Sequence, residues 1–161
     1  MEEEQAPLAQ AQVEAFGRAF FDAARTGNVG AFRKLLPTRE EQRMCSEERQ
    51  AGYGYDPRDP QAKAAALAKS DHCWTQYMDF MPQNFRAFVQ EAPAEGIVWA
   101  KAQYLGAVAE GLARTPNVYV YLRAGSKVFK IKLDDAIITA RGLTMGDGIQ
   151  WIRESSWPPE D

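Results

Sequence analysis

The stretch that decides the fold is residues 118–133, VYVYLRAGSKVFKIKL. Apolar residues alternate with tyrosine, arginine and lysine on both sides of a Gly125-Ser126 pair. Such alternation predicts two strands that each bury one face. A two-residue Gly-Ser loop is typical of a type II′ turn, because glycine takes the positive φ at the first central position. The sequence therefore predicts a tight β-hairpin at Gly125-Ser126.

The turn also predicts the register of this hairpin. With Ala124 opposite Lys127, the six apolar residues of the two strands pair with one another and share one face. These expected pairs are Val118 with Leu133, Val120 with Ile131, and Leu122 with Phe129. A shift of one residue would expose half of the six, so we expect this register alone.

The rest of the C-terminal half reads as further strands. Residues 97–109 alternate as a long strand, although their alanine and glutamine content also permits a helix. Ile137 and Ile138 are expected to continue the strand that begins after the hairpin. After a turn at Arg141-Gly142, residues 143–152 return as a last strand. That strand should contain a bulge or bend at residues 145–148, because two glycines weaken regular pairing. The tail from residue 155 is expected to fray.

The N-terminal half reads as helices. Apolar residues at spacings of three and four predict helices over residues 8–26 and 29–36. Thr38 and Glu41 form a capping box, which predicts a polar helix from residue 38 to about residue 50. Residues 51–60 read as a loop and residues 61–69 as a helix. Ser70 is expected to cap a further helix that reaches residue 92, with an interruption at Pro82.

These elements predict an α+β fold, with N-terminal helices packed on one face of a curved, roughly four-stranded C-terminal antiparallel sheet. The 161 residues suit a single domain, 1–161, made of a helical part over 8–92, a meander over 96–153 and a tail over 154–161. The sequence has no apolar run of membrane-spanning length and no signal-peptide pattern at its start. We therefore expect a soluble protein, either cytoplasmic or exported and given without its signal peptide.

Two stretches resemble the nuclear transport factor two-like superfamily, within the cystatin-like α+β group. They are residues 13–36, VEAFGRAFFDAARTGNVGAFRKLL, and residues 118–151, with the Gly125-Ser126 hairpin and a late Gly-Asp-Gly. The resemblance is to small uncharacterised bacterial members and implies a bent sheet wrapped around helices, enclosing a cone-shaped cavity. Its enzymes use an aspartate or a His/Asp pair in that cavity, whereas many members are binding modules. The lone His72 lies in the helical half, so no catalytic residue is carried over.

A cavity of that kind would place several residues together. Trp99, Tyr104 and Trp151 would form its walls. Asp134 or Asp135 would act as a general base, since aspartate is disfavoured in strands and its presence there invites a functional explanation. The structural alternative is a bulge or edge position. The sequence contains no phosphate-loop, nucleophile-elbow or zinc-protease motif, and we predict no cofactor and no metal ligand.

The polar face of the hairpin is a second candidate site. It carries Tyr119, Tyr121, Arg123, Lys130 and Lys132. Tyrosine and arginine are favoured at protein interfaces, so a protein partner or a second copy is expected there. Aromatic and basic sheet faces also bind single-stranded nucleic acid, but the net charge of −3 disfavours this alternative.

The reactive side chains of the helical half give no clear site. Asp71, His72 and Cys73 are adjacent, and neighbours on a helix point about 100° apart, which places them poorly for joint catalysis. Cys45 and Cys73 permit one disulfide or two ordinary thiols. The sequence predicts a non-enzymatic binding module that engages a protein partner or itself through its sheet. The alternatives are a small-molecule pocket protein or cavity enzyme, and a single-strand nucleic-acid binder.

Overall fold

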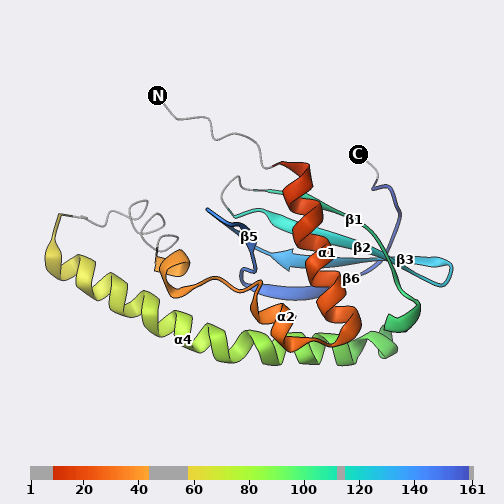
Figure 1. Ribbon diagram of the computed structural model, residues 1–161, viewed down its shortest axis with the longest axis horizontal. Coiled ribbons are helices and arrows are strands. Elements are labelled where there is room, and N and C mark those ends of the chain that lie inside the picture. The colour runs from red at the N-terminus through yellow and green to blue at the C-terminus, as the bar shows by residue number, and fades with distance from the viewer. Residues whose placement is uncertain (1–8, 44–57, 112–114, 160–161) are drawn as a thin grey trace.

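The computed structural model describes residues 9–43, 58–111 and 115–159 (Figure 1). Helices come first: α1 (Gln10–Thr26), α2 (Val29–Arg33) and α4 (Pro60–Glu91). Two short 3-10 helices, η1 (Ala92–Glu95) and η2 (Trp99–Lys101), lead into the strands. The predicted α+β class is confirmed, because an antiparallel sheet follows the helices.

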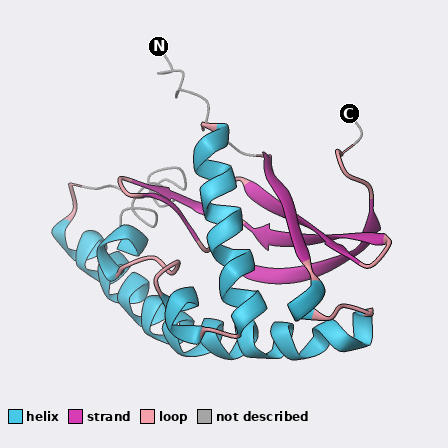
Figure 2. Cartoon of the chain, turned by 45° about the vertical axis from the view of Figure 1, so that its right-hand side comes forward, coloured by secondary structure: helices cyan, strands magenta, loops and turns pink. Residues whose placement is uncertain are grey.

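The main sheet has four strands in the order β1-β2-β3-β6. Its strands are β1 (Gln103–Glu110), β2 (Asn117–Ala124), β3 (Lys127–Asp134) and β6 (Gly148–Ser155). Between β3 and β6, the short strands β4 (Ile137–Thr139) and β5 (Gly142–Thr144) form a separate two-stranded sheet. Figure 2 shows α1 crossing one face of the main sheet, which we call the inner face.

The predicted hairpin is confirmed in full. Ala124 lies opposite Lys127, and the three expected apolar pairs form along β2 and β3. All six of their side chains are buried on the inner face. Gly125 has a φ of +64°, and Asp135 is the one non-glycine residue of the described chain with a positive φ. Positive φ at Gly125 followed by negative φ at Ser126 is the pattern of the predicted turn.

The core lies between the inner face and the helices. The Phe32 and Phe85 rings stack with centroids 4.2 Å apart, and Phe20 meets both edge-on. Helix α1 approaches β1 closely because Gly17 has no side chain. A Cβ built there would lie 2.5 Å from the Cβ of Ala107. This contact sets the distance between the helix layer and the sheet.

Two predictions about the helical half are wrong. The helices expected over residues 61–69 and 70–92 are one helix, α4, and Ser70 is buried inside it. The cap is Asp59, whose carboxylate accepts a hydrogen bond from the Gln61 amide at 3.0 Å. Pro82 does not interrupt the helix. An internal proline costs about 3 kcal/mol of helix stability, and burial of Phe85 and Phe88 beyond it offsets that cost.

The capping box is confirmed. The Glu41 carboxylate accepts a hydrogen bond from the Thr38 amide at 2.8 Å, and the Glu41 amide donates to the Thr38 hydroxyl at 3.2 Å. Residues 39–43 are helical. The remainder of this predicted helix and most of the predicted loop over 51–60 lie outside the described residues.

The strand expected from residue 97 begins later. Residues 99–101 form η2, and β1 begins at Gln103. The physical reason is a side-chain contact that the alternation does not encode. The indole of Trp99 donates a hydrogen bond to the Val89 carbonyl at 3.1 Å, which turns this segment back onto the end of α4.

The expectation that Ile137 and Ile138 continue β3 is wrong, and so is the single last strand over residues 143–152. The chain turns at Asp135, which has a φ of +48°. Gly146 crosses this corner so closely that a Cβ there would lie 1.8 Å from the Asp135 carbonyl oxygen. The Asp147 amide donates to the Asp134 carbonyl at 2.8 Å. The predicted bend at residues 145–148 is therefore the place where β5 and β6 separate.

The tail is more ordered than predicted. Strand β6 extends to Ser155, and the Trp157 ring packs on Tyr121 with centroids 5.0 Å apart. Trp157 also covers Gly106, where an added Cβ would lie 2.3 Å from the indole. In the described part of the chain, no helix combines the length and apolarity needed to cross a membrane.

Candidate functional site

The sheet face away from the helices, which we call the outer face, carries the predicted partner-binding residues. The Lys130 ammonium lies over the Tyr119 ring, 4.2 Å from its centroid, and 5.6 Å from that of Tyr121. Lys132 is 3.6 Å from an Asp134 carboxylate oxygen. Arg123 is exposed and has no ion-pair partner within the described ranges. The five predicted residues therefore share one face of the sheet.

Tyr121 differs from the other members of this set. Its side chain is 2% exposed because Trp157 covers it. The accessible part of the outer face is therefore Tyr119 with Arg123, Lys130 and Lys132. Tyr121 is buried and contacts Lys130 with its ring. Sequence alternation could not reveal this, since it does not show that the tail folds back onto the sheet.

Two of the residues predicted to line a cavity pack against each other instead. Trp99 and Trp151 pack on each other at 5.8 Å, and Trp151 stacks on Phe88 at 4.4 Å. These rings fill the space between helices and sheet where a cavity wall was expected.

The two predicted carboxylates lie elsewhere. Asp134 is on the outer face beside Lys132, whereas Trp151 lies opposite Ile131 on the inner face. The Asp135 amide donates to the Asn117 side chain at 3.0 Å, as part of the corner with Gly146. Neither aspartate therefore lies beside the two tryptophans, and the mid-strand placement of Asp135 is wrong, because β3 ends at Asp134.

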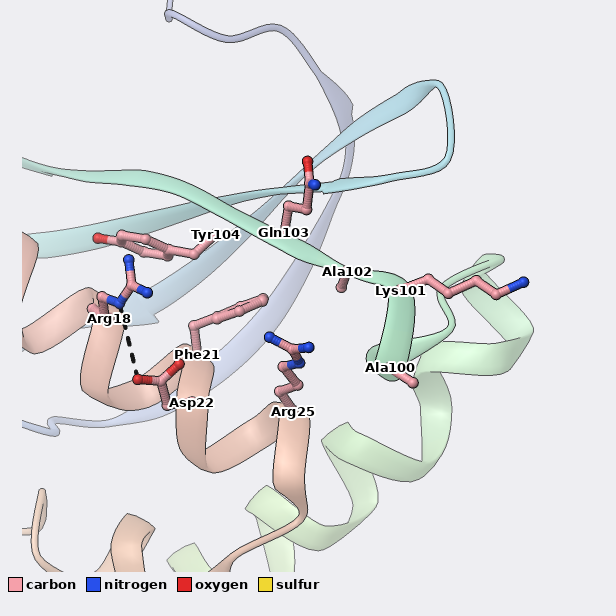
Figure 3. Close-up of a pocket in the computed structure, with 9 residues that line it drawn as sticks. All are labelled: Arg18, Phe21, Asp22, Arg25, Ala100, Lys101, Ala102, Gln103 and Tyr104. Carbon is pink, nitrogen blue, oxygen red and sulfur yellow. Dashed lines mark ion pairs between the residues drawn. The ribbon is translucent and has the colours of Figure 1, made fainter.

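Tyr104 does line a hollow, but a different one. A groove of about 590 Å³ opens between α1 and the segment formed by η2 and the start of β1 (Figure 3). Three basic side chains and one carboxylate surround it, and Phe21 and Tyr104 supply two aromatic rings. Its lining residues are Arg18, Phe21, Asp22, Arg25, Ala100, Lys101, Ala102, Gln103 and Tyr104.

Contacts within the groove hold one side of it in place. The Tyr104 hydroxyl donates a 2.7 Å hydrogen bond to Glu14, and the Arg18 guanidinium lies 5.4 Å from the centroid of the Tyr104 ring. Burial and this hydrogen bond raise the pKa of Tyr104 well above its usual range. Arg18 also lies 4.0 Å from Asp22 across a turn of helix. Tyr104 is therefore a neutral, fixed wall.

Sequence reasoning assigned Tyr104 to a different cavity and missed the basic residues of the groove. Arg18, Asp22 and Arg25 follow one another at helical spacing along the polar side of α1, which is the normal composition of a solvated helix face. Lys101 comes from η2, which the sequence predicted as strand. No local motif links these residues, because α1 and η2 are far apart in the chain.

The Asp71, His72 and Cys73 cluster forms no joint site. The Asp71 carboxylate accepts a hydrogen bond from Arg43 at 2.7 Å, which holds the pKa of Asp71 below its usual range. His72 and the free thiol Cys73 are exposed, and Cys45 lies outside the described residues. Among the residues that the structure describes, no three His, Cys, Asp or Glu side chains are grouped to hold a metal ion.

Comparisons with protein families, curated proteins and solved structures found no match to this chain. The resemblance to the nuclear transport factor two-like superfamily therefore stays a prediction.

Proposed function

We propose that this protein is a non-enzymatic binding module whose outer sheet face engages an acidic segment of a partner protein. The observation that supports this most is the placement of the helices. Helices α1 and α4 contact the sheet on its inner face, and no described helix covers the outer face (Figure 2). That face presents Tyr119 together with Arg123, Lys130 and Lys132.

Charge complementarity supports an acidic partner. The chain carries a net charge of −3, yet the accessible centre of the outer face is basic. Among the described side chains of that centre, Lys132 forms an ion pair with Asp134 at 3.6 Å, and no described carboxylate pairs with Arg123 or Lys130. A basic patch on an acidic protein attracts acidic segments and disfavours association with basic ones.

The arrangement of Lys130 also supports binding. Its ammonium is held between two tyrosine rings, so little side-chain freedom remains to be lost when a carboxylate approaches. Tyr119 contributes the aromatic ring that lies under this ammonium. Tyrosine and arginine are the residue types most often found at the energetic centre of interfaces.

The test is a selection of peptides displayed on phage against the immobilised full chain. Selected peptides are then measured by fluorescence anisotropy on the variant Arg123→Glu/Lys132→Glu. The matched control is Lys69→Glu/Arg86→Glu, which makes the same charge change at exposed positions of α4. We expect acidic peptides whose affinity falls at least about tenfold on the first variant and little on the control.

Three results would contradict the proposal. The first is a set of peptides without acidic excess, and the second is a set of peptides that bind both variants equally. The third is a dimer in native mass spectrometry that the outer-face variant abolishes, because the occupant would then be a second copy. If that variant fails to fold, Arg123→Ala is used instead, since Arg123 is exposed and unpaired in the described chain.

A further inference from the structure

Two basic residues that the fold does not use line the groove between α1 and η2. Arg25 lies in the last turn of α1 and Lys101 is the last residue of η2. Both are exposed, and neither has a hydrogen bond or ion pair to any residue that the structure describes. Figure 3 shows the Arg25 side chain rising from α1 into the groove, whereas the Lys101 side chain extends from the rim and away from it.

The groove as a whole is electropositive. Arg18, Arg25 and Lys101 line the groove together with one carboxylate, Asp22, so the lining has an excess of two positive charges in a chain of net charge −3. The Glu14 carboxylate, bonded to the Tyr104 hydroxyl, is not among the lining residues. Like charges gathered in a concave site repel one another unless an anion neutralises them. A concave surface also concentrates the field more than a flat one does.

We propose that this groove binds a compact polyanion, meaning a small molecule with at least two anionic oxygens, such as a phosphate ester or a polycarboxylate. Arginine provides a planar fork that matches both groups, and the flexible stem of lysine lets its ammonium fold onto them. The Tyr104 hydroxyl is already bonded to Glu14, so the Tyr104 side of the groove contributes a fixed aromatic wall. The guanidinium of Arg18, next to that ring, contributes a third cation.

Asp22 gives the proposal its sharpest test. Its carboxylate lies in the groove and competes with a ligand for Arg18, 4.0 Å away. Replacing Asp22 with asparagine removes that competitor and a repulsive charge while keeping the shape. The variant Asp22→Asn should therefore bind a polyanion about three- to tenfold more tightly than the natural chain. Asp79→Asn makes the same charge change at an exposed position of α4 and serves as its control.

The experiment is a calorimetric titration of the full chain at low ionic strength, where screening is weak. The probes are inorganic pyrophosphate and citrate, with sodium chloride at equal ionic strength as the blank. We expect both to compete for one saturable site. The variant Arg25→Ala/Lys101→Ala should weaken binding at least about tenfold. Lys69→Ala/Arg86→Ala loses the same charge elsewhere and should weaken it little.

The relative affinities of the two probes distinguish a phosphorylated ligand from a polycarboxylate. The absence of saturable binding would overturn the proposal. An equal loss of affinity in both double variants would overturn it as well. An equal gain of affinity in Asp22→Asn and Asp79→Asn would also do so, because either pattern indicates unspecific charge attraction. These residues are separate from the outer sheet face, so the two proposals fail independently.

Discussion

Trp99 and Trp151 pack with ring centroids 5.8 Å apart, but they differ in how their indole nitrogens are satisfied. Trp99 donates to the Val89 carbonyl at 3.1 Å. The Trp151 nitrogen is buried and has no hydrogen-bond partner among the described residues. A buried unpaired donor costs about 1–3 kcal/mol of stability, so the two tryptophans contribute unequally to a shared cluster.

Phenylalanine substitutions measure this difference. Trp99→Phe removes a satisfied hydrogen bond, whereas Trp151→Phe removes an unsatisfied donor and keeps a ring against Phe88. We expect Trp99→Phe to lower the free energy of unfolding by at least about 1 kcal/mol more than Trp151→Phe does. Urea denaturation followed by circular dichroism gives both values. Equal losses would show that ring volume alone determines the effect.

Gly146→Ala is expected to destabilise the protein severely. The new Cβ would lie 1.8 Å from the Asp135 carbonyl oxygen, and a backbone atom cannot rotate away as a side chain can. Overpacking of this kind costs about 3 kcal/mol or more. Gly148→Ala is the matched control, since nothing lies within 4 Å of its added Cβ. Thermal unfolding of the two variants should differ by many degrees, and similar midpoints would disprove the close crossing.

Glu41 predicts a pH dependence of stability. Partial burial opposes its ionisation, but hydrogen bonds from Arg141 and from the Thr38 amide outweigh that and lower the pKa of Glu41 to about 2. A lowered folded-state pKa stabilises the fold at pH values above the unfolded-state pKa, near 4.5, and this stability is lost as the pH falls toward 2.

The contribution of Glu41 at neutral pH is about 1–2 kcal/mol, reduced by solvent screening because the Arg141 side chain is 47% exposed. The variant Glu41→Gln should therefore be less stable than the natural chain at pH 7, and the difference should shrink below pH 4.5. Glu40→Gln, at the exposed neighbouring position, is the control. A difference that stays constant from pH 7 to pH 2 would contradict this account.

Trp157→Ala should expose the buried Tyr121 side chain of the outer face and destabilise the fold. Tyr121 is 2% exposed under the Trp157 ring, and Gly106 is covered by the same indole. Loss of this partly buried aromatic is expected to cost about 1–3 kcal/mol. Trp157→Phe keeps a ring on Tyr121 and should lose less. Guanidinium denaturation checks the order of the two variants, and a neutral Trp157→Ala would mean that the tail does not hold the sheet.

The hairpin was predictable because two independent signals agreed. The Gly125-Ser126 turn and the alternation of residues 118–133 each required the same register, and every predicted pair formed. The capping box at Thr38 was predictable for a similar reason, since it involves residues three positions apart. Local chemistry determines both features, so no knowledge of distant contacts was needed.

The features that sequence reasoning missed all depend on distant contacts. Proline at position 82 normally ends a helix, and only the burial of the residues after it keeps α4 continuous. The corner at Asp135 requires Gly146 to pass against it. The groove combines α1 with η2, and each part alone resembles an ordinary solvated surface. Spacing along the chain cannot encode such encounters.

The contacts of α1 also determine when the chain is able to fold during its synthesis. Helix α1 packs against β1, β2 and β5, and the Leu35 carbonyl accepts a hydrogen bond from the Met145 amide at 2.7 Å. A ribosome synthesises the helices before the strands, so the side chains of Phe20, Phe32 and Phe85 have no sheet to pack against until the strands are made. Such non-local pairing slows folding and leaves apolar surface exposed on the nascent chain. Shielding by a chaperone would therefore matter most for this protein while its final strands are still being translated.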